Sequence, residues 1–141
     1  MKRSIALLIV CILIVLLCSC GDGSSAKQST IDGMYEIESV LYEGYYLSPD
    51  ESISTSYVSV TQSEKNLFAT VYLSIEDEFG MLVGHLSEHS KTDESIQYKF
   101  WIDSTVGDLV NGTDWIYIYY YPNSDSVEIN ASGDMCFEFV K

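Results

Sequence analysis

A clean alternation of side chains runs through Leu67-Phe68-Ala69-Thr70-Val71-Tyr72-Leu73-Ser74-Ile75, and this stretch decides the fold. Small and aliphatic side chains occupy every second position from Ala69 to Ile75. Hydroxyl-bearing side chains occupy the positions between them. A period of two is typical of a β-strand that buries one face. The sequence therefore predicts a half-buried strand over 67–75.

The same kind of pattern recurs on both sides of this stretch. Further strands are expected at 34–42, 57–61, 79–86, 96–102, 115–121, 127–131 and 135–140. Turn signals such as Asn111-Gly112 and Pro122-Asn123-Ser124-Asp125 separate them. No helical period is longer than two turns, and the best candidates for a short helix are 47–54 and 104–109. About seven or eight short strands predict an all-β fold, a single small antiparallel barrel or meander over residues 32–141.

The N-terminal segment has the features of a signal peptide. Lys2 and Arg3 precede an aliphatic run from Ile5 to Leu17. As a helix, this run would span about 20 Å, which is short of the roughly 30 Å hydrocarbon core of a bilayer. We therefore expect a cleaved export signal rather than a transmembrane helix.

The end of that segment, Leu17-Cys18-Ser19-Cys20-Gly21, resembles the lipobox of bacterial lipoproteins. The resemblance implies a signal peptide at 1–19, cleavage before Cys20, and lipidation of Cys20. Cys18 is the alternative, but it would place the bulky Leu17 in the cleavage pocket. A plain secretory signal is a second alternative. Residues 20–31 would then form the lipidated cysteine and a flexible linker, whose reach is about 17 Å. The partner implied at this end is the outer face of the cell membrane.

A second resemblance concerns the domain itself. Gly33-Met34-Tyr35 opens the first strand, and Phe137-Glu138-Phe139-Val140-Lys141 ends the last. This arrangement is similar to that of the small lipocalin-like lipoproteins of Gram-positive bacteria, with Gly-x-Tyr where lipocalins carry Gly-x-Trp. The resemblance implies a lipocalin-like barrel. The lipocalin helix after the last strand is not expected here, which favours a squat barrel with a small or filled interior.

The charge of the chain restricts its partners. It has 7 Lys and Arg against 21 Asp and Glu, a net charge of −14. Such an acidic chain repels nucleic acid, so no nucleic-acid partner is expected. Beyond the signal peptide and Cys20, the sequence contains one cysteine, Cys136, which lies in a predicted strand and is expected to be inert. No cofactor is indicated.

One motif points to a metal. His85-Leu86-Ser87-Glu88-His89 matches the His-x-x-Glu-His of inverzincin peptidases, in which both histidines bind zinc and the glutamate polarises water. That chemistry needs a helix, which places residues four apart on one face. In a strand, His85 and His89 would stand about 13 Å apart. The surrounding residues favour a strand that runs into a hairpin, so no metal site is expected.

The aromatic residues are the other candidate site. Trp115, Tyr117, Tyr119 and Tyr121 share one face of the strand 115–121, and Trp101 lies in another predicted strand. Tyrosine and tryptophan combine a flat apolar ring with a polar tip, which suits a binding groove. They also fill β cores well, and core packing is the more ordinary explanation.

These observations predict a non-enzymatic lipoprotein anchored on the extracytoplasmic face of the cell membrane. It would bind a small apolar ligand or an envelope protein through the barrel mouth or an aromatic face. Two alternatives stay open at this point. One is a zinc-dependent hydrolase that uses His85, Glu88 and His89, and the other is a spacer or assembly lipoprotein without a ligand.

Overall fold

The computed structural model of the chain describes residues 30–49, 53, 55–110, 112–131 and 135–141. The predicted signal peptide 1–19 and the predicted lipidation site Cys20 lie outside the described residues, as does most of the linker. Within the described part, no helix is long and apolar enough to cross a membrane.

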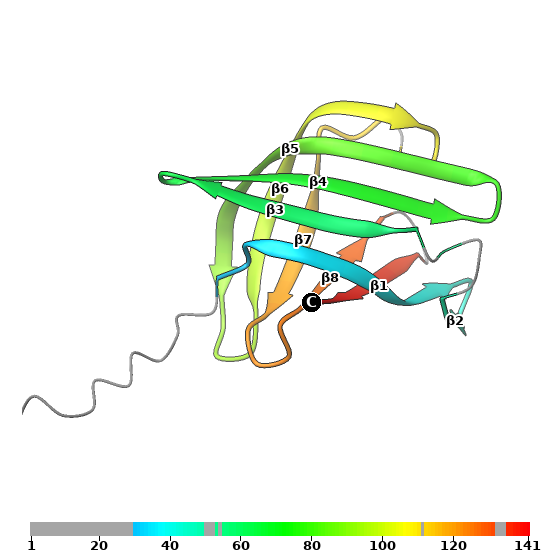
Figure 1. The fold of residues 1–141 in the computed structure, drawn as a ribbon, viewed down its shortest axis with the longest axis horizontal. Coiled ribbons are helices and arrows are strands. Elements are labelled where there is room, and N and C mark those ends of the chain that lie inside the picture. The colour runs from blue at the N-terminus through cyan, green and yellow to red at the C-terminus, as the bar shows by residue number, and fades with distance from the viewer. Residues whose placement is uncertain (1–29, 50–52, 54, 111, 132–134) are drawn as a thin grey trace, which may run out of the picture.

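The described residues form one antiparallel sheet that closes on itself (Figure 1). The all-β prediction is confirmed, as a closed barrel of the small lipocalin-like kind with one extra strand. The strands are β1 (Gly33–Tyr42), β2 (Tyr45–Leu47), β3 (Tyr57–Ser63), β4 (Asn66–Ile75), β5 (Glu78–Lys91), β6 (Ile96–Gly107), β7 (Trp115–Tyr121), β8 (Ser126–Asn130) and β9 (Cys136–Val140). They follow one another around the barrel in chain order, except for the short β2.

The first strand closes the barrel because it pairs with both neighbours. Residues 33–36 of β1 pair with β3, and residues 36–41 pair with β9. The register with β9 shifts between Ile37 and Ser39, which is a bulge of the kind that lets a strand bend around a barrel. The strand β2 adds to the far end of β1 and lies outside the closed ring.

The interior is filled by the inward set of each alternating strand. In β4 these are Ala69, Val71, Leu73 and Ile75, as the alternation predicts. The largest fully buried side chains include Tyr35, Phe100, Tyr120, Phe137 and Phe139. Among the residues that the structure describes, the buried hydrophobic side chains, from Ile31 to Phe139, form one core cluster. Ile31, which the sequence placed at the end of the linker, is part of this core.

The strand β5 bends where glycine allows a close approach. At Gly84, a Cβ would lie 1.8 Å from the carbonyl oxygen of Trp101 and 3.0 Å from the Phe100 ring. The register between β5 and β6 shifts at Val83 and Gly84. Only a residue without a side chain fits between the strands at this point, so Gly84 is required by packing.

The structure differs from the sequence prediction in three places. The strands β5 and β6 are longer than expected, because they continue to Lys91 and from Ile96 to Gly107. The candidate helix 104–109 is therefore wrong, since residues 104–107 belong to β6. The strand β2 was not predicted, and it occupies the start of the other candidate helix, 47–54, which is only partly described.

Candidate functional site

The predicted aromatic residues of β7 lie on the outside of the barrel. Trp115 is 36% exposed, and Tyr117, Tyr119 and Tyr121 are half-buried. The alternate side chains of this strand, Ile116, Ile118 and Tyr120, fill the interior instead. The interpretation of Trp115, Tyr117, Tyr119 and Tyr121 as core residues is therefore wrong. Both faces of β7 are apolar, but only one face of a strand can point into the barrel, and here it is the face of Ile116, Ile118 and Tyr120.

The register between β6 and β7 brings Trp101 to the same outer surface. Trp101 pairs with Trp115, Lys99 with Tyr117, and Gln97 with Tyr119. Trp101 is 38% exposed. We call the surface formed by Trp101, Trp115, Tyr117 and Tyr119, together with Lys99 and His89, the aromatic face.

Contacts between these side chains hold the aromatic face in a defined arrangement. The ammonium group of Lys99 lies 4.0 Å from the ring centroid of Trp101 and 4.1 Å from that of Trp115. The Tyr117 ring packs against Trp115, with centroids 5.0 Å apart, and against His89 at 5.3 Å. Each cation–π contact contributes about 0.5–1 kcal/mol at an exposed site. These contacts therefore favour one arrangement of the cluster.

The polar groups of Trp101 and Tyr119 in the aromatic face have hydrogen-bond partners within the protein. Trp101 Nε1 donates a hydrogen bond to Ser87 Oγ at 3.2 Å. Gln97 Nε2 donates to the Tyr119 hydroxyl oxygen at 2.8 Å. The rings therefore keep fixed orientations and present apolar surface, which is the kind of surface that fills interface hot spots.

Tyr121 stands at the edge of this surface, next to β8. Its hydroxyl donates a hydrogen bond to Glu128 Oε2 at 3.1 Å. Burial, followed by the charge of Glu128, raises the pKa of Tyr121 to about 12. The hydroxyl stays protonated at neutral pH and serves as a hydrogen-bond donor.

The residues of the zinc motif lie on β5 and not on a helix. His85 Nδ1 is 3.2 Å from Asp103 Oδ2, while His89 packs on Tyr117. Within the described ranges, no group of three His, Cys, Asp or Glu side chains is placed to hold a metal ion. The extended backbone of 78–91 removes the helical spacing on which the zinc interpretation of His85, Glu88 and His89 depends.

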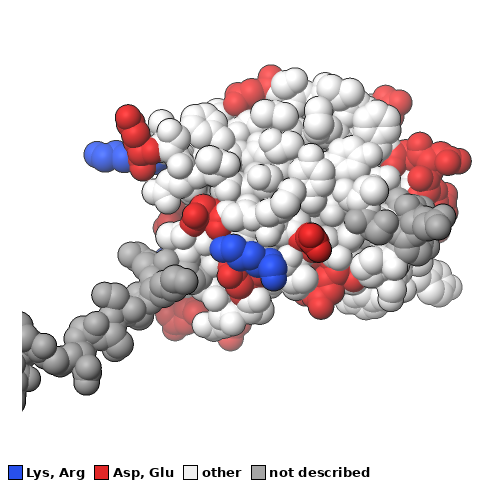
Figure 2. Space-filling model, viewed as in Figure 1, with Lys and Arg blue, Asp and Glu red and all other residues white. Residues whose placement is uncertain are grey.

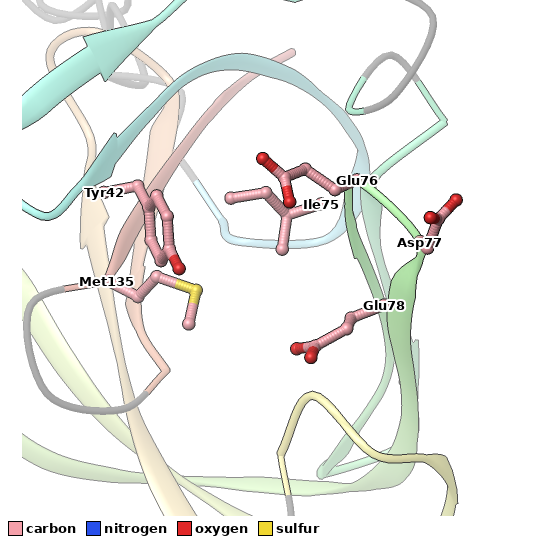
Figure 3. Close-up of a pocket in the computed structure, with 6 residues that line it drawn as sticks. All are labelled: Tyr42, Ile75, Glu76, Asp77, Glu78 and Met135. Carbon is pink, nitrogen blue, oxygen red and sulfur yellow. The ribbon is translucent and has the colours of Figure 1, made fainter.

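Among the hollows in the described part of the barrel, two small ones lie near its ends. The first has a volume of about 190 Å³ and is lined by Tyr42, Ile75, Glu76, Asp77, Glu78 and Met135. In Figure 3, Tyr42 and Met135 stand on one side of it, facing Glu76 and Glu78, while Asp77 points away. The second, of about 230 Å³, is lined by residues that include Ile31, Lys65, Glu88, Lys91 and Tyr98. Pockets for drug-sized ligands are about 300–1,000 Å³ and mostly apolar, so neither hollow resembles a lipocalin calyx.

Cys136 faces outward from β9 and is half-buried. Burial and the neighbouring carboxylate of Glu128 raise the pKa of its thiol to about 12. Because the thiolate is the reactive form, this cysteine is a poor nucleophile. That agrees with the inert role expected from the sequence.

Sequence reasoning missed Lys99, Gln97 and His89 as members of the site. The available signal was the alternation of Gln97, Lys99 and Trp101 within one predicted strand, which places the three on one face. Comparisons of the chain with protein-family models, curated proteins and solved structures return no match.

Proposed function

We propose that this chain is a lipid-anchored, extracytoplasmic, non-enzymatic protein that binds a protein partner of the cell envelope through its aromatic face. The observation that carries this proposal is the position of that face. Five aromatic side chains singled out in the sequence lie on one outer surface of the barrel, Trp101, Trp115, Tyr117 and Tyr119 within the aromatic face and Tyr121 at its edge.

The anchor part of the proposal is supported by residues 17–21. The lipobox-like Leu17-Cys18-Ser19-Cys20-Gly21 precedes a linker rich in glycine and serine. With a reach of about 17 Å, such a linker would keep the barrel close to the outer face of the membrane, as in a Gram-positive cell. Two or three acyl chains on Cys20 would make the attachment lasting.

A protein partner fits the geometry better than a small apolar ligand. A small ligand needs a concave site that covers most of its surface. The aromatic face lies on the outside of the barrel and cannot enclose one, and the two hollows are small and carry charged side chains. Interface hot spots in protein complexes are enriched in tryptophan and tyrosine. Lys99, held between two indole rings, adds one cationic group that can select an acidic partner.

The partner can be sought by photo-crosslinking in cells that express the full chain. A photoreactive phenylalanine analogue replaces Tyr117 in the aromatic face or, as a matched control, Tyr46, which is 77% exposed on β2. We expect a discrete crosslinked species from position 117 and none from position 46. In the Trp101→Ala/Trp115→Ala background that species should disappear. Equal crosslinking from both positions, or none from position 117, would contradict the proposal.

A small-molecule cargo has a separate test. Native mass spectrometry of residues 24–141 is compared with the denatured mass, and we expect the two masses to agree. An additional mass that matches a lipid or another small molecule would replace the proposed protein partner with a carrier role.

The anchor is tested on the mature N-terminus. We expect the mass of a diacylglyceryl-modified Cys20 at the start of the membrane-bound protein. Cys20→Ala should release an unmodified chain, while Cys18→Ala should leave the modification in place. Lipid on Cys18, or a mature chain without lipid, would contradict this part of the proposal.

A further inference from the structure

A part of the barrel surface outside the aromatic face carries no charged side chain. It comprises the outward-facing side chains of 57–61 on β3, 68–74 on β4 and 79–83 on β5, together with Val106 on β6. We call this surface the uncharged face. Figure 2 shows it as a white expanse over the strands that face the viewer, with acidic residues at its margins.

The register makes the uncharged face continuous across four strands. Tyr57 pairs with Tyr72, Tyr72 with Met81, and Met81 with Val106. The rings of Tyr57 and Tyr72 stack with centroids 5.7 Å apart. The rings of Tyr72 and Phe79 stack in turn at 6.2 Å. The surface is thus an ordered sheet of rings, methyl groups and hydroxyls.

Large apolar side chains are exposed on this face. Phe68 is 47% exposed, Phe79 42%, Val83 40% and Val106 51%. Single exposed apolar residues are ordinary, whereas several on one continuous face mark an interaction surface. Their neighbours include Tyr57, Tyr72 and Met81, whose residue types are enriched at protein interfaces, and the other neighbours are uncharged serine and threonine.

Charges border the uncharged face on every side. Glu36 on β1 pairs with Tyr57, and Asp103 lies beside Val83 and His85 at the bulge of β6. The turn containing Glu64 lies at one end, and the turn 76–78, which is entirely acidic, lies at the other. Roughly a quarter to a third of an ordinary soluble surface is charged. A charge-free area of this size in a chain of net charge −14 therefore distinguishes this face from the rest of the molecule.

We propose that the uncharged face associates with the same face of a second copy of this chain. Two copies of so acidic a chain repel each other wherever carboxylates meet. This face brings rings and hydroxyls against rings and hydroxyls, so the copies meet there without opposed charges at the centre of the contact. A two-fold axis through the face makes the two surfaces identical, as in most homodimers.

The size of the face predicts a weak dimer. Three strands about 4.8 Å apart, with five to seven residues each at about 3.3 Å, together with Val106 on a fourth strand, cover roughly 300 Å² per copy. Stable dimers bury about 800 Å² per partner or more, so this contact belongs to the weak class. Association is therefore expected at high protein concentration.

The acidic margins give the dimer a characteristic salt dependence. The carboxylates that border one copy approach those of the other when the faces meet. Salt shortens the screening length from about 10 Å at 0.1 M to about 3 Å at 1 M, which weakens this repulsion. The uncharged centre has no ion pair for salt to weaken. The dimer should therefore become tighter as the salt concentration rises.

Sedimentation velocity on residues 24–141 tests the proposal, since the whole described core lies within this fragment. A concentration series is measured at low and high NaCl. We expect a concentration-dependent shift from monomer to dimer that is larger at high salt. Val83→Asp and Val106→Asp should abolish the shift because each places a carboxylate at the contact. Tyr46→Asp, a matched change at an exposed apolar residue outside the face, should leave it intact, and circular dichroism checks that each variant is folded.

Three results would overturn the proposal. They are a chain that stays monomeric at every concentration and salt level, an association that weakens with salt, and an association that survives both Val83→Asp and Val106→Asp. The Trp101→Ala/Trp115→Ala variant separates this proposal from the proposed function. It should still dimerise while losing its partner. Loss of the dimer in that variant would assign self-association to the aromatic face instead.

Discussion

A Cβ on residue 84 would lie 1.8 Å from the carbonyl oxygen of Trp101, because the backbone of Gly84 passes that close to β6. The contact lies at the register shift between Val83 and Gly84. The same contact also affects the candidate site. The backbone of Trp101 packs against Gly84, while the indole ring of Trp101 lies on the outer surface in the aromatic face.

Replacing Gly84 by alanine should be strongly destabilising. The added methyl group meets a backbone oxygen that cannot move without breaking the pairing of β5 and β6. Overpacked sites cost about 1–3 kcal/mol and sometimes more, and we expect Gly84→Ala to reach at least about 3 kcal/mol. Urea unfolding measures this loss. Gly112→Ala is the control, because its Cβ meets nothing within 4 Å and its cost arises from the φ of +73° alone, about 1 kcal/mol. Equal losses in the two variants would show that the strands do not approach as described.

Removing the ammonium group of Lys99 should alter the fluorescence of the whole chain. The chain has 2 tryptophans, Trp101 and Trp115, and Lys99 contacts both of them. We expect Lys99→Met to change the emission intensity and to lower the free energy of unfolding by about 0.5–1 kcal/mol. Lys65→Met, in the turn between β3 and β4, should change neither. An unchanged emission spectrum in Lys99→Met would mean that the cation does not lie between the rings.

The stability of the barrel should fall in alkaline solution. Burial raises the pKa of Tyr98 from 10.0 to about 12, and the pKa values of Tyr121 and Cys136 are also raised to about 12. A pKa that is higher in the folded state than in the unfolded state means that the folded state favours the protonated, neutral form. The corresponding stability is fully present below pH about 9–10 and is lost as the pH rises towards 12.

Urea unfolding midpoints at pH 8, 10 and 11 measure this decline. Tyr98→Phe removes one of the titrating groups, so its midpoint should fall less than that of the native chain over the same interval. Tyr46→Phe removes an exposed hydroxyl and should decline like the native chain. A native midpoint that is unchanged between pH 8 and 11 would contradict the burial of these hydroxyls.

Cys136 should react slowly with thiol reagents. Burial and Glu128 raise its pKa to about 12, so the thiolate is scarce at pH 8. In residues 24–141 this is the single cysteine. We expect alkylation to be about a hundredfold slower than that of free cysteine, and Glu128→Gln to speed it by removing the nearby negative charge. Glu88→Gln, on another part of the surface, should leave the rate unchanged. Rapid alkylation of the native chain would show that the thiol is more exposed than described.

The sequence pattern predicts the strand segments that bury one face. It does not predict the segments of β5 and β6 whose two faces are both exposed to water. Alternation from Ala69 to Ile75 located β4 closely. Beyond Leu86, every residue of β5 is exposed, so the segment 87–91 shows no alternation and the sequence predicts a strand only as far as Leu86. The same holds for residues 103–106 of β6. These segments are strands because they pair with a neighbouring strand, and the local sequence pattern does not reveal that pairing.

The candidate site was predictable in composition but not in position. The alternation of 115–121 showed that Trp115, Tyr117, Tyr119 and Tyr121 share a face, but both faces of this strand are apolar. Ile116, Ile118 and Tyr120 face inward because of the register with the buried residues of β6 and β8. The pairing of Trp101 with Trp115 depends on the path of the loop between the two strands, which a single sequence does not specify.

The pairing of β1 with β9 also determines when the barrel can form. A chain that emerges from the ribosome N-terminus first has β1 available well before β9. Until residues 136–140 have emerged, Phe137 and Phe139 are missing from the core, and the facing edges of β1 and β8 lack their partner. Contacts between such distant residues form slowly. The ring therefore cannot close until β9, the last of its strands to be synthesised, has emerged and paired with both β1 and β8.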